Sequence, residues 1–186
     1  MALLWCWRWA EHASALNLVQ QANVTSAPIQ RIAAMPYPIN PWRWHALIET
    51  DSTWQTAEVD TRIGRVESDP KINSLFKPQN TAATQAARQT RLGQVYLDWS
   101  KWPVVRDLGP QPIPGRAAPD FPPTRPWSTV EFRDLRFAYP FLSPSMDSAS
   151  NQGLEELLNK SALSGYVYIL DGHEEAGQFM NGREQK

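Results

Sequence analysis

Residues 41–61 read "PWRWHALIETDSTWQTAEVDT", two segments of alternating apolar and polar residues on either side of a short polar turn. In an extended chain successive side chains point to opposite faces, so the even-numbered residues from Trp42 to Ile48 share one face. The dipeptide Asp51-Ser52 suits a tight turn. The stretch therefore predicts an antiparallel hairpin, and the segments around it are expected to extend the sheet.

The clearest helix is predicted for residues 81–101, "TAATQAARQTRLGQVYLDWSK". Its alanine-rich first half favours a helix, and Pro103 limits where the helix can end. The large side chains of its second half follow the i, i+3, i+4, i+7 spacing of one buried stripe, which consists of Leu92, Val95, Tyr96 and Trp99.

Together these patterns predict an α+β fold, a single domain in which a twisted antiparallel sheet of about six or seven strands carries the 81–101 helix on one face. Residues 1–25 are expected to form an N-terminal helix that precedes this domain, which then spans residues 26–186. The proline-rich segment 110–126 is predicted to be a long loop without regular structure, which either covers another part of the chain or is mobile.

The N-terminal segment 1–21, "MALLWCWRWAEHASALNLVQQ", begins with an apolar run that Arg8 interrupts. The run is too short to span a bilayer, and it lacks the features of a signal peptide. Two interpretations stay open. The tryptophans around Arg8 resemble the aromatic and basic rim where a membrane helix meets water. In the other interpretation, the segment is an amphipathic helix that packs on the domain through its later leucines and Val19.

Composition and charge narrow the range of functions. The chain has 186 residues and a formal net charge of −1, which gives no electrostatic basis for binding nucleic acid. The single cysteine, Cys6, excludes an internal disulfide and a cysteine-built zinc site, and it leaves the compartment undetermined. The histidines are scattered along the sequence, so no metal site is predicted in this chain. The sequence also lacks phosphate-binding glycine loops and the common hydrolase motifs.

The segment "VEFRDLRFAYPF", residues 130–141, is predicted to be a strand with charged residues in its middle. Its apolar phase shifts by one residue between Phe132 and Leu135, which predicts a bulge. Asp134 and Arg136 would then point to the same face. One interpretation is a structural salt bridge, within the strand or to a neighbouring glutamate. The other is an arginine that Asp134 orients so that it binds a carboxylate or a phosphate.

A second candidate site lies in the segment "NPWRWH", which places Arg43 between Trp42 and Trp44. Tryptophans on a sheet face can stack a flat or sugar-like ligand. Such a row is more often core beneath a covering helix. Neither candidate site has recognisable catalytic residues beside it in the sequence, so no catalytic residue is assigned.

Four segments occur in one order along the chain: "AMPYPINPWRWHALIETDSTWQTAEVD", "DWSKWPVVR", "VEFRDLRFAYPF" and "GREQ". Together they resemble the C-terminal soluble region of the bacterial membrane-bound metal-dependent hydrolase family (YdjM-like, LexA-binding inner-membrane-associated hydrolases). The resemblance covers roughly residues 28–140, with a weaker one over 165–184. Members of this family carry an N-terminal bundle of membrane helices that holds histidine and aspartate motifs. This sequence lacks that bundle, and its first residues resemble the end of a last membrane helix.

The resemblance implies the soluble domain of a membrane-bound metal-dependent hydrolase, itself a binding or regulatory module without catalytic residues. It implies a divalent metal only for the membrane-embedded part, and no cofactor in this chain. Expected partners are that membrane-embedded region or the membrane surface, together with a small anionic ligand. The expected location is the inner membrane, on an undetermined side, or otherwise the cytoplasm. The candidate ligand-binding residues, which all match the family's motifs, are Arg43, Trp44, Glu49, Asp134 and Arg136.

Two alternatives remain at this stage. The chain could be a free-standing enzyme that acts on an anionic substrate held by Arg43 and Arg136. It could also be a truncated fragment that folds but has no function alone. An enzyme predicts a deep pocket on which carboxylates or histidines converge.

Overall fold

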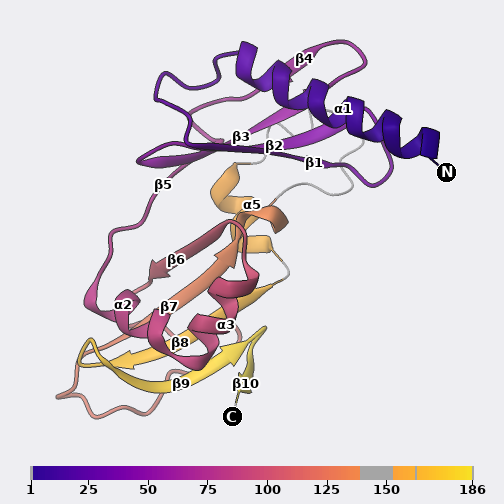
Figure 1. Ribbon diagram of the computed structural model, residues 1–186. Helices are drawn as coiled ribbons and strands as arrows, with labels where there is room; N and C mark the ends of the chain where they lie inside the picture. Colours follow the sequence, from indigo (N-terminus) through magenta and orange to yellow (C-terminus); the bar gives the residue numbers. More distant parts are fainter. Residues whose placement is uncertain (1, 139–152, 162, 186) are drawn as a thin grey trace. The chain divides into compact units, whose positions relative to one another are not determined.

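The computed structural model describes residues 2–138, 153–161 and 163–185 (Figure 1). These residues form helices and ten strands, which pair in two antiparallel sheets of five strands each. The predicted α+β class and antiparallel pairing are confirmed, and the strands divide between two sheets where the sequence led us to expect one.

The described chain forms two compact units. The first consists of the described residues of Met1–Lys77 and Ala138–Lys160, and the second of those of Pro78–Phe137 and Ser161–Lys186. The N-terminal helix belongs to the first unit together with the sheet that follows it.

The described residues of the first unit form a five-stranded sheet and two helices. The strands pair in the order β1-β2-β3-β4, and β5 also pairs with β3. Its elements are α1 (Ala2–Gln21), β1 (Arg31–Pro36), β2 (Arg43–Glu49), β3 (Thr53–Asp60), β4 (Arg65–Glu67), β5 (Ser74–Phe76) and α5 (Leu154–Lys160). The predicted hairpin is confirmed, because β2 and β3 pair antiparallel across the Asp51-Ser52 turn.

The core of the first unit lies between α1 and one face of this sheet. Ala15 and Val19, in the second half of α1, are fully buried. They belong to one apolar cluster with Trp44 and Ile48, on the face of β2 that the alternating pattern predicts to be apolar. All residues of β2 before Glu49 are buried, so the other face of the strand is covered as well.

The second unit contains a sheet with the strand order β10-β9-β8-β7-β6. Its elements are α2 (Ala82–Gln89), α3 (Arg91–Trp99), β6 (Pro103–Asp107), β7 (Trp127–Asp134), the short 3-10 helix η1 (Leu135–Phe137), β8 (Ser164–Leu170), β9 (Glu174–Met180) and β10 (Arg183–Gln185). Tyr96 and other buried residues of α2 and α3 form one core cluster with Phe132 and Val167 of the sheet.

The proline-rich segment 110–126 packs on the sheet of the second unit. Ile113 is 1% exposed and clusters with Tyr166 and Tyr168. The backbone N–H of Ile113 donates to the hydroxyl of Tyr168 at 3.2 Å, and Phe121 makes an edge contact with the same ring. Through Ile113 and Phe121 the loop covers part of this sheet, in line with one of its two expected roles.

The single helix predicted for residues 81–101 is wrong, because the chain breaks it at Thr90 into α2 and α3. Thr90 is extended, with φ −67° and ψ 161°. Its hydroxyl donates to the carbonyl of Ala87 at 2.7 Å and accepts from the N–H of Gly93 at 3.1 Å. One threonine side chain therefore forms hydrogen bonds with a free carbonyl at the end of α2 and a free N–H at the start of α3. Helical periodicity alone does not reveal such a break.

The predicted buried stripe of this helix is only half correct. Leu92 and Tyr96 are buried, whereas Val95 is 64% exposed and Trp99 is 42% exposed. The break at Thr90 sets α3 in its own orientation, so that it packs through Leu92, Gly93 and Tyr96.

The bulge predicted after Phe132 is also wrong. Strand β7 ends at Asp134, and Leu135–Phe137 form a single 3-10 turn in which Leu135 is fully buried. The shift in apolar phase therefore marks the end of a strand. The part of the predicted strand after Ala138 lies outside the described residues.

Candidate functional site

Asp134 and Arg136 form a tight pair at the end of β7. The Arg136 guanidinium donates to Asp134 Oδ2 from Nε at 2.9 Å and from Nη2 at 2.7 Å. The backbone N–H of Arg136 donates to the other carboxylate oxygen at 2.9 Å. The Asp134 side chain, which is completely buried, thus caps the 3-10 turn that follows the strand. An anion could engage this arginine only beside or in place of Asp134.

Two further donors approach the Asp134 carboxylate. Ser100 donates from its hydroxyl at 2.7 Å and Lys101 from its backbone N–H at 3.1 Å. Burial by itself raises the pKa of Asp134, but the hydrogen bonds from Arg136 and Ser100 outweigh burial and hold that pKa below its ordinary value. The Arg136 guanidinium also lies 4.9 Å from the Trp99 ring centroid. The pair therefore ties the end of β7 to the end of α3.

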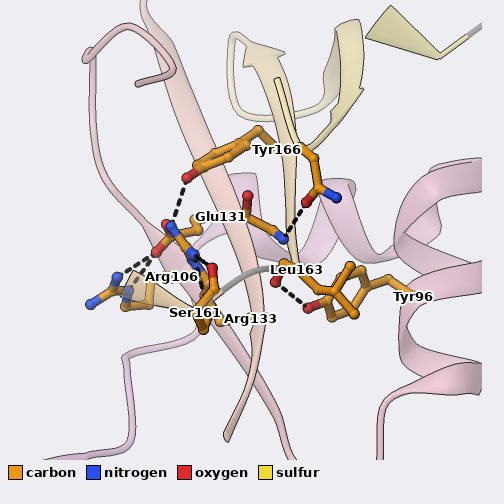
Figure 2. Close-up of polar contacts among 9 residues, drawn as sticks. Tyr96, Arg106, Glu131, Arg133, Ser161, Leu163 and Tyr166 are labelled. Carbon is orange, nitrogen blue, oxygen red and sulfur yellow. Dashed lines mark hydrogen bonds and ion pairs between the residues drawn. The ribbon is translucent and has the colours of Figure 1, made fainter. Parts of the chain in front are cut away.

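A second charged cluster lies on strands β6, β7 and β8 of the same sheet and is shown in Figure 2. Glu131 of β7 accepts from Arg106 Nε at 2.9 Å and from Arg133 Nε at 2.9 Å. Arg133 also donates to the Tyr166 hydroxyl at 2.8 Å and to the Ser161 carbonyl at 2.8 Å. These contacts link β6, β7 and β8 across one face of the sheet, because alternate residues of a strand share a face.

The electrostatics of this cluster favour ionised Glu131. Its side chain is 4% exposed, and burial by itself raises the pKa of the carboxyl. The charges of Arg106 and Arg133 outweigh burial, so the pKa of Glu131 lies below its ordinary value. This cluster was not predicted from the sequence. The signal was the i, i+2 spacing of Glu131 and Arg133, but Arg106, the other partner of Glu131, lies 25 residues before Glu131 in the chain.

Arg43, predicted as a ligand-binding residue, is buried in the first unit. It is 4% exposed, donates to Glu58 at 3.2 Å, and stacks its guanidinium 4.5 Å from the Tyr37 ring centroid. His45 contacts the other oxygen of Glu58 at 2.6 Å through Nδ1. Arg43 and Trp44 are neighbours in an extended strand, so their side chains lie on opposite faces of β2. The predicted ligand platform of Trp42 and Trp44 is not open, because Trp44 is 3% exposed and lies in the core, which is the other interpretation of this row.

Trp44 and Glu49 have separate surroundings. Trp44 lies in the core beneath α1, with the Arg8 guanidinium 4.6 Å from its ring centroid. Glu49 forms ion pairs with Arg31 at 2.8 Å and with Lys77 at 2.9 Å. Burial by itself raises the pKa of Glu49, whereas its bonds to Lys77 and Arg31 lower it, and the net pKa lies below the ordinary value.

A groove of about 340 Å³ runs along α3 in the second unit. Its lining residues are Arg91, Leu92, Val95, Tyr96 and Trp99 of α3, Gln178 and Met180 of β9, and Gln185 of β10. The groove lies within the size range of small-molecule sites in proteins. None of the residues predicted to bind a ligand lines this groove. The sequence did not indicate a groove here, because Val95 and Trp99 were predicted to be buried in the core.

The first half of α1 carries a cluster of exposed apolar side chains. We call it the apolar end of α1, and it consists of Leu3, Leu4, Trp5 and Trp9. Trp5 and Trp9 are each 75% exposed and are one helical turn apart, on the same side of the helix. Among the described residues, no helix combines the length and the apolar character needed to cross a membrane.

Comparison of the chain with protein-family models, with curated proteins and with solved structures found no match in any of the three. Within the part of the chain that the structure describes, no group of three or more His, Cys, Asp or Glu residues could hold a metal ion.

Proposed function

We propose that this chain is a binding or regulatory module that the apolar end of α1 holds at a membrane surface. The observation that carries the proposal is the contrast between the two halves of α1. Ala15 and Val19 in the second half are fully buried, whereas Leu3 is 86% exposed and Trp5 is 75% exposed. The sheet thus provides a partner for only half of the apolar surface of the helix.

Physical chemistry favours a lipid interface as the partner of the exposed half. Moving a large apolar side chain out of water makes the free energy of membrane binding more favourable by ~1.5–3 kcal/mol. Indole rings prefer the boundary between headgroups and acyl chains. Arg8 donates to the Pro41 carbonyl at 2.6 Å. Because this arginine is directed toward its own unit, we expect binding to depend on apolar contact more than on anionic lipid.

A module at the membrane surface agrees with the family resemblance, which implies the soluble domain of a membrane-bound hydrolase. A module at the membrane surface is placed where it can act on a membrane-embedded hydrolase region, and a divalent metal would belong to that region. The alternative, an enzyme that holds an anionic substrate through Arg43 and Arg136, is less favoured. Arg43 is 4% exposed and paired with Glu58, and Arg136 is paired with Asp134.

The test is co-sedimentation of the full chain with phosphatidylcholine vesicles. We expect binding that changes little when the salt concentration is raised and that the double substitution Trp5→Glu/Trp9→Glu abolishes. The matched control is Ile39→Glu/Ile63→Glu, because these residues are also exposed, at 80% and 64%, and lie outside α1. The control should bind as the wild type does.

A second readout locates the contact. Cys6 is the single cysteine of the chain and is exposed, and it lies within the apolar end of α1. A polarity-sensitive fluorophore on Cys6 should shift to shorter wavelength when vesicles are added. Absence of the shift, or equal vesicle binding by both double variants, would refute the proposal.

A further inference from the structure

We propose that the groove along α3 binds a medium-chain fatty carboxylate, with the alkyl chain against α3 and the carboxylate on Arg91. This site is separate from the apolar end of α1 and does not depend on membrane binding. The groove lies wholly within the second unit, between α3 and the strands β9 and β10.

The wall of the groove is suited to an alkyl chain. Val95 and Trp99 are substantially exposed, and with Leu92, Tyr96 and Met180 they form its apolar surface. Both ends of α3 line the groove, so it follows the helix for ~12 Å at a rise of ~1.5 Å per residue. An extended chain of medium length spans that distance, and its burial supplies the main part of the binding free energy.

Two contacts hold the walls of the groove in place before any ligand enters. The Gln178 side-chain carbonyl accepts from the backbone N–H of Leu92 at 2.6 Å, which joins β9 to the start of α3. The Tyr96 hydroxyl donates to the Leu163 carbonyl at 3.2 Å, which joins the middle of α3 to the residue before β8. A preformed groove lowers the cost of ordering on binding.

Charge decides which end group the ligand carries. Arg91 is exposed at the start of α3, and among the described residues its guanidinium has no hydrogen-bond or ion-pair partner. By contrast, Arg133 and Arg136 in the same unit are paired with carboxylates. An available guanidinium beside an apolar surface matches a carboxylate at the end of an alkyl chain, which it can hold through two hydrogen bonds.

The experiment compares decanoate with 1-decanol by isothermal titration calorimetry on the full chain, below the concentrations at which decanoate self-associates. Both should bind at one site, and decanoate about tenfold more tightly because of its charged hydrogen bonds to Arg91. Arg91→Gln should weaken decanoate about tenfold and leave 1-decanol unchanged. The control Arg62→Gln, an exposed arginine of the first unit, should leave both affinities unchanged.

A second pair of variants tests the groove itself. Val95 and Ile63 are both 64% exposed, and only Val95 lines the groove. Val95→Glu should abolish binding of both ligands, and Ile63→Glu should not, with circular dichroism showing that each variant is folded. Equal affinity for the two ligands, or no effect of Arg91→Gln, would refute the role of Arg91. Binding that Val95→Glu leaves intact, or that Trp5→Glu/Trp9→Glu removes, would refute the groove as the site.

Discussion

Replacing Gly93 with alanine should have two opposite effects on stability, a gain from helix propensity and a loss from steric overlap. Gly93 lies in the first turn of α3, where its N–H donates to the hydroxyl of Thr90. In a helix, alanine is more stable than glycine by ~1 kcal/mol, so propensity alone predicts a more stable protein. A Cβ atom at Gly93, however, would lie 2.1 Å from the carbonyl oxygen of Ala87 and 3.0 Å from the Cα atom of Arg88.

The steric effect should dominate. Both obstacles are backbone atoms of the α2 segment, so the added methyl group can be accommodated only if α2 and α3 separate. Overpacking of this kind costs ~1–3 kcal/mol, and we take the upper end because no flexible side chain can move away. Subtracting the propensity gain leaves a net loss of ~2 kcal/mol in the free energy of unfolding.

The assay is thermal and urea denaturation of wild-type protein and Gly93→Ala, followed by circular dichroism. A loss of ~2 kcal/mol corresponds to a fall of ~4–8 °C in Tm for a chain of this size. The neighbouring exposed position supplies the control, because Gln94→Ala should be more stable than Gln94→Gly by ~1 kcal/mol. If alanine stabilises the protein at both positions, the close approach of α3 to the end of α2 does not exist.

Three further predictions concern the buried polar contacts. Glu131→Gln leaves Arg106 and Arg133 without their buried counter-charge. Urea denaturation at neutral pH should show that the free energy of unfolding falls by ~3 kcal/mol. A loss below ~1 kcal/mol would contradict the burial of the cluster. The folded-state pKa values of Glu131 and Asp134 lie below their ordinary values. Their stabilisation should therefore be complete above about pH 5 and be lost as the pH falls below about 4. Urea titrations at a series of pH values should show a shallower acid loss for Glu131→Gln than for wild type, and parallel curves would count against the assignment. Thr90→Ala removes the side-chain bonds at the α2–α3 junction and should cost ~1 kcal/mol, whereas an unchanged urea midpoint would mean that those bonds contribute nothing.

Local sequence patterns predicted the charged pair that lies within one segment, but not the contact between two distant segments. The short spacing of Asp134 and Arg136 predicts a local pair, and the pair forms, although through a turn that ends the strand. The partners of Glu131 could not be predicted in the same way. Arg106 reaches it only because β6 pairs with β7 in the register that places Arg106 opposite Glu131. That register depends on the packing of the whole sheet.

The groove along α3 was likewise not predictable from local spacing. Helical spacing puts Val95 and Trp99 on one stripe with Leu92 and Tyr96, so all four were predicted to be buried. The extended backbone and the cap at Thr90 break the helix, the absence of a side chain at Gly93 lets α3 approach Ala87 closely, and α3 buries a face that includes Leu92 and Tyr96. An exposed apolar wall is the result, and it carries the proposed ligand site.

Local signals in the sequence were enough to predict the hairpin of residues 43–60, the helical character of residues 82–99 and the antiparallel α+β class. Period-two alternation and turn residues act over a few neighbouring positions, so they can be read along the chain. Three features are visible only in the folded protein: the strands form two sheets, Glu131 lies between two arginines, and α3 exposes a groove. These features arise from contacts between residues far apart in sequence, and local periodicity carries no information about such contacts.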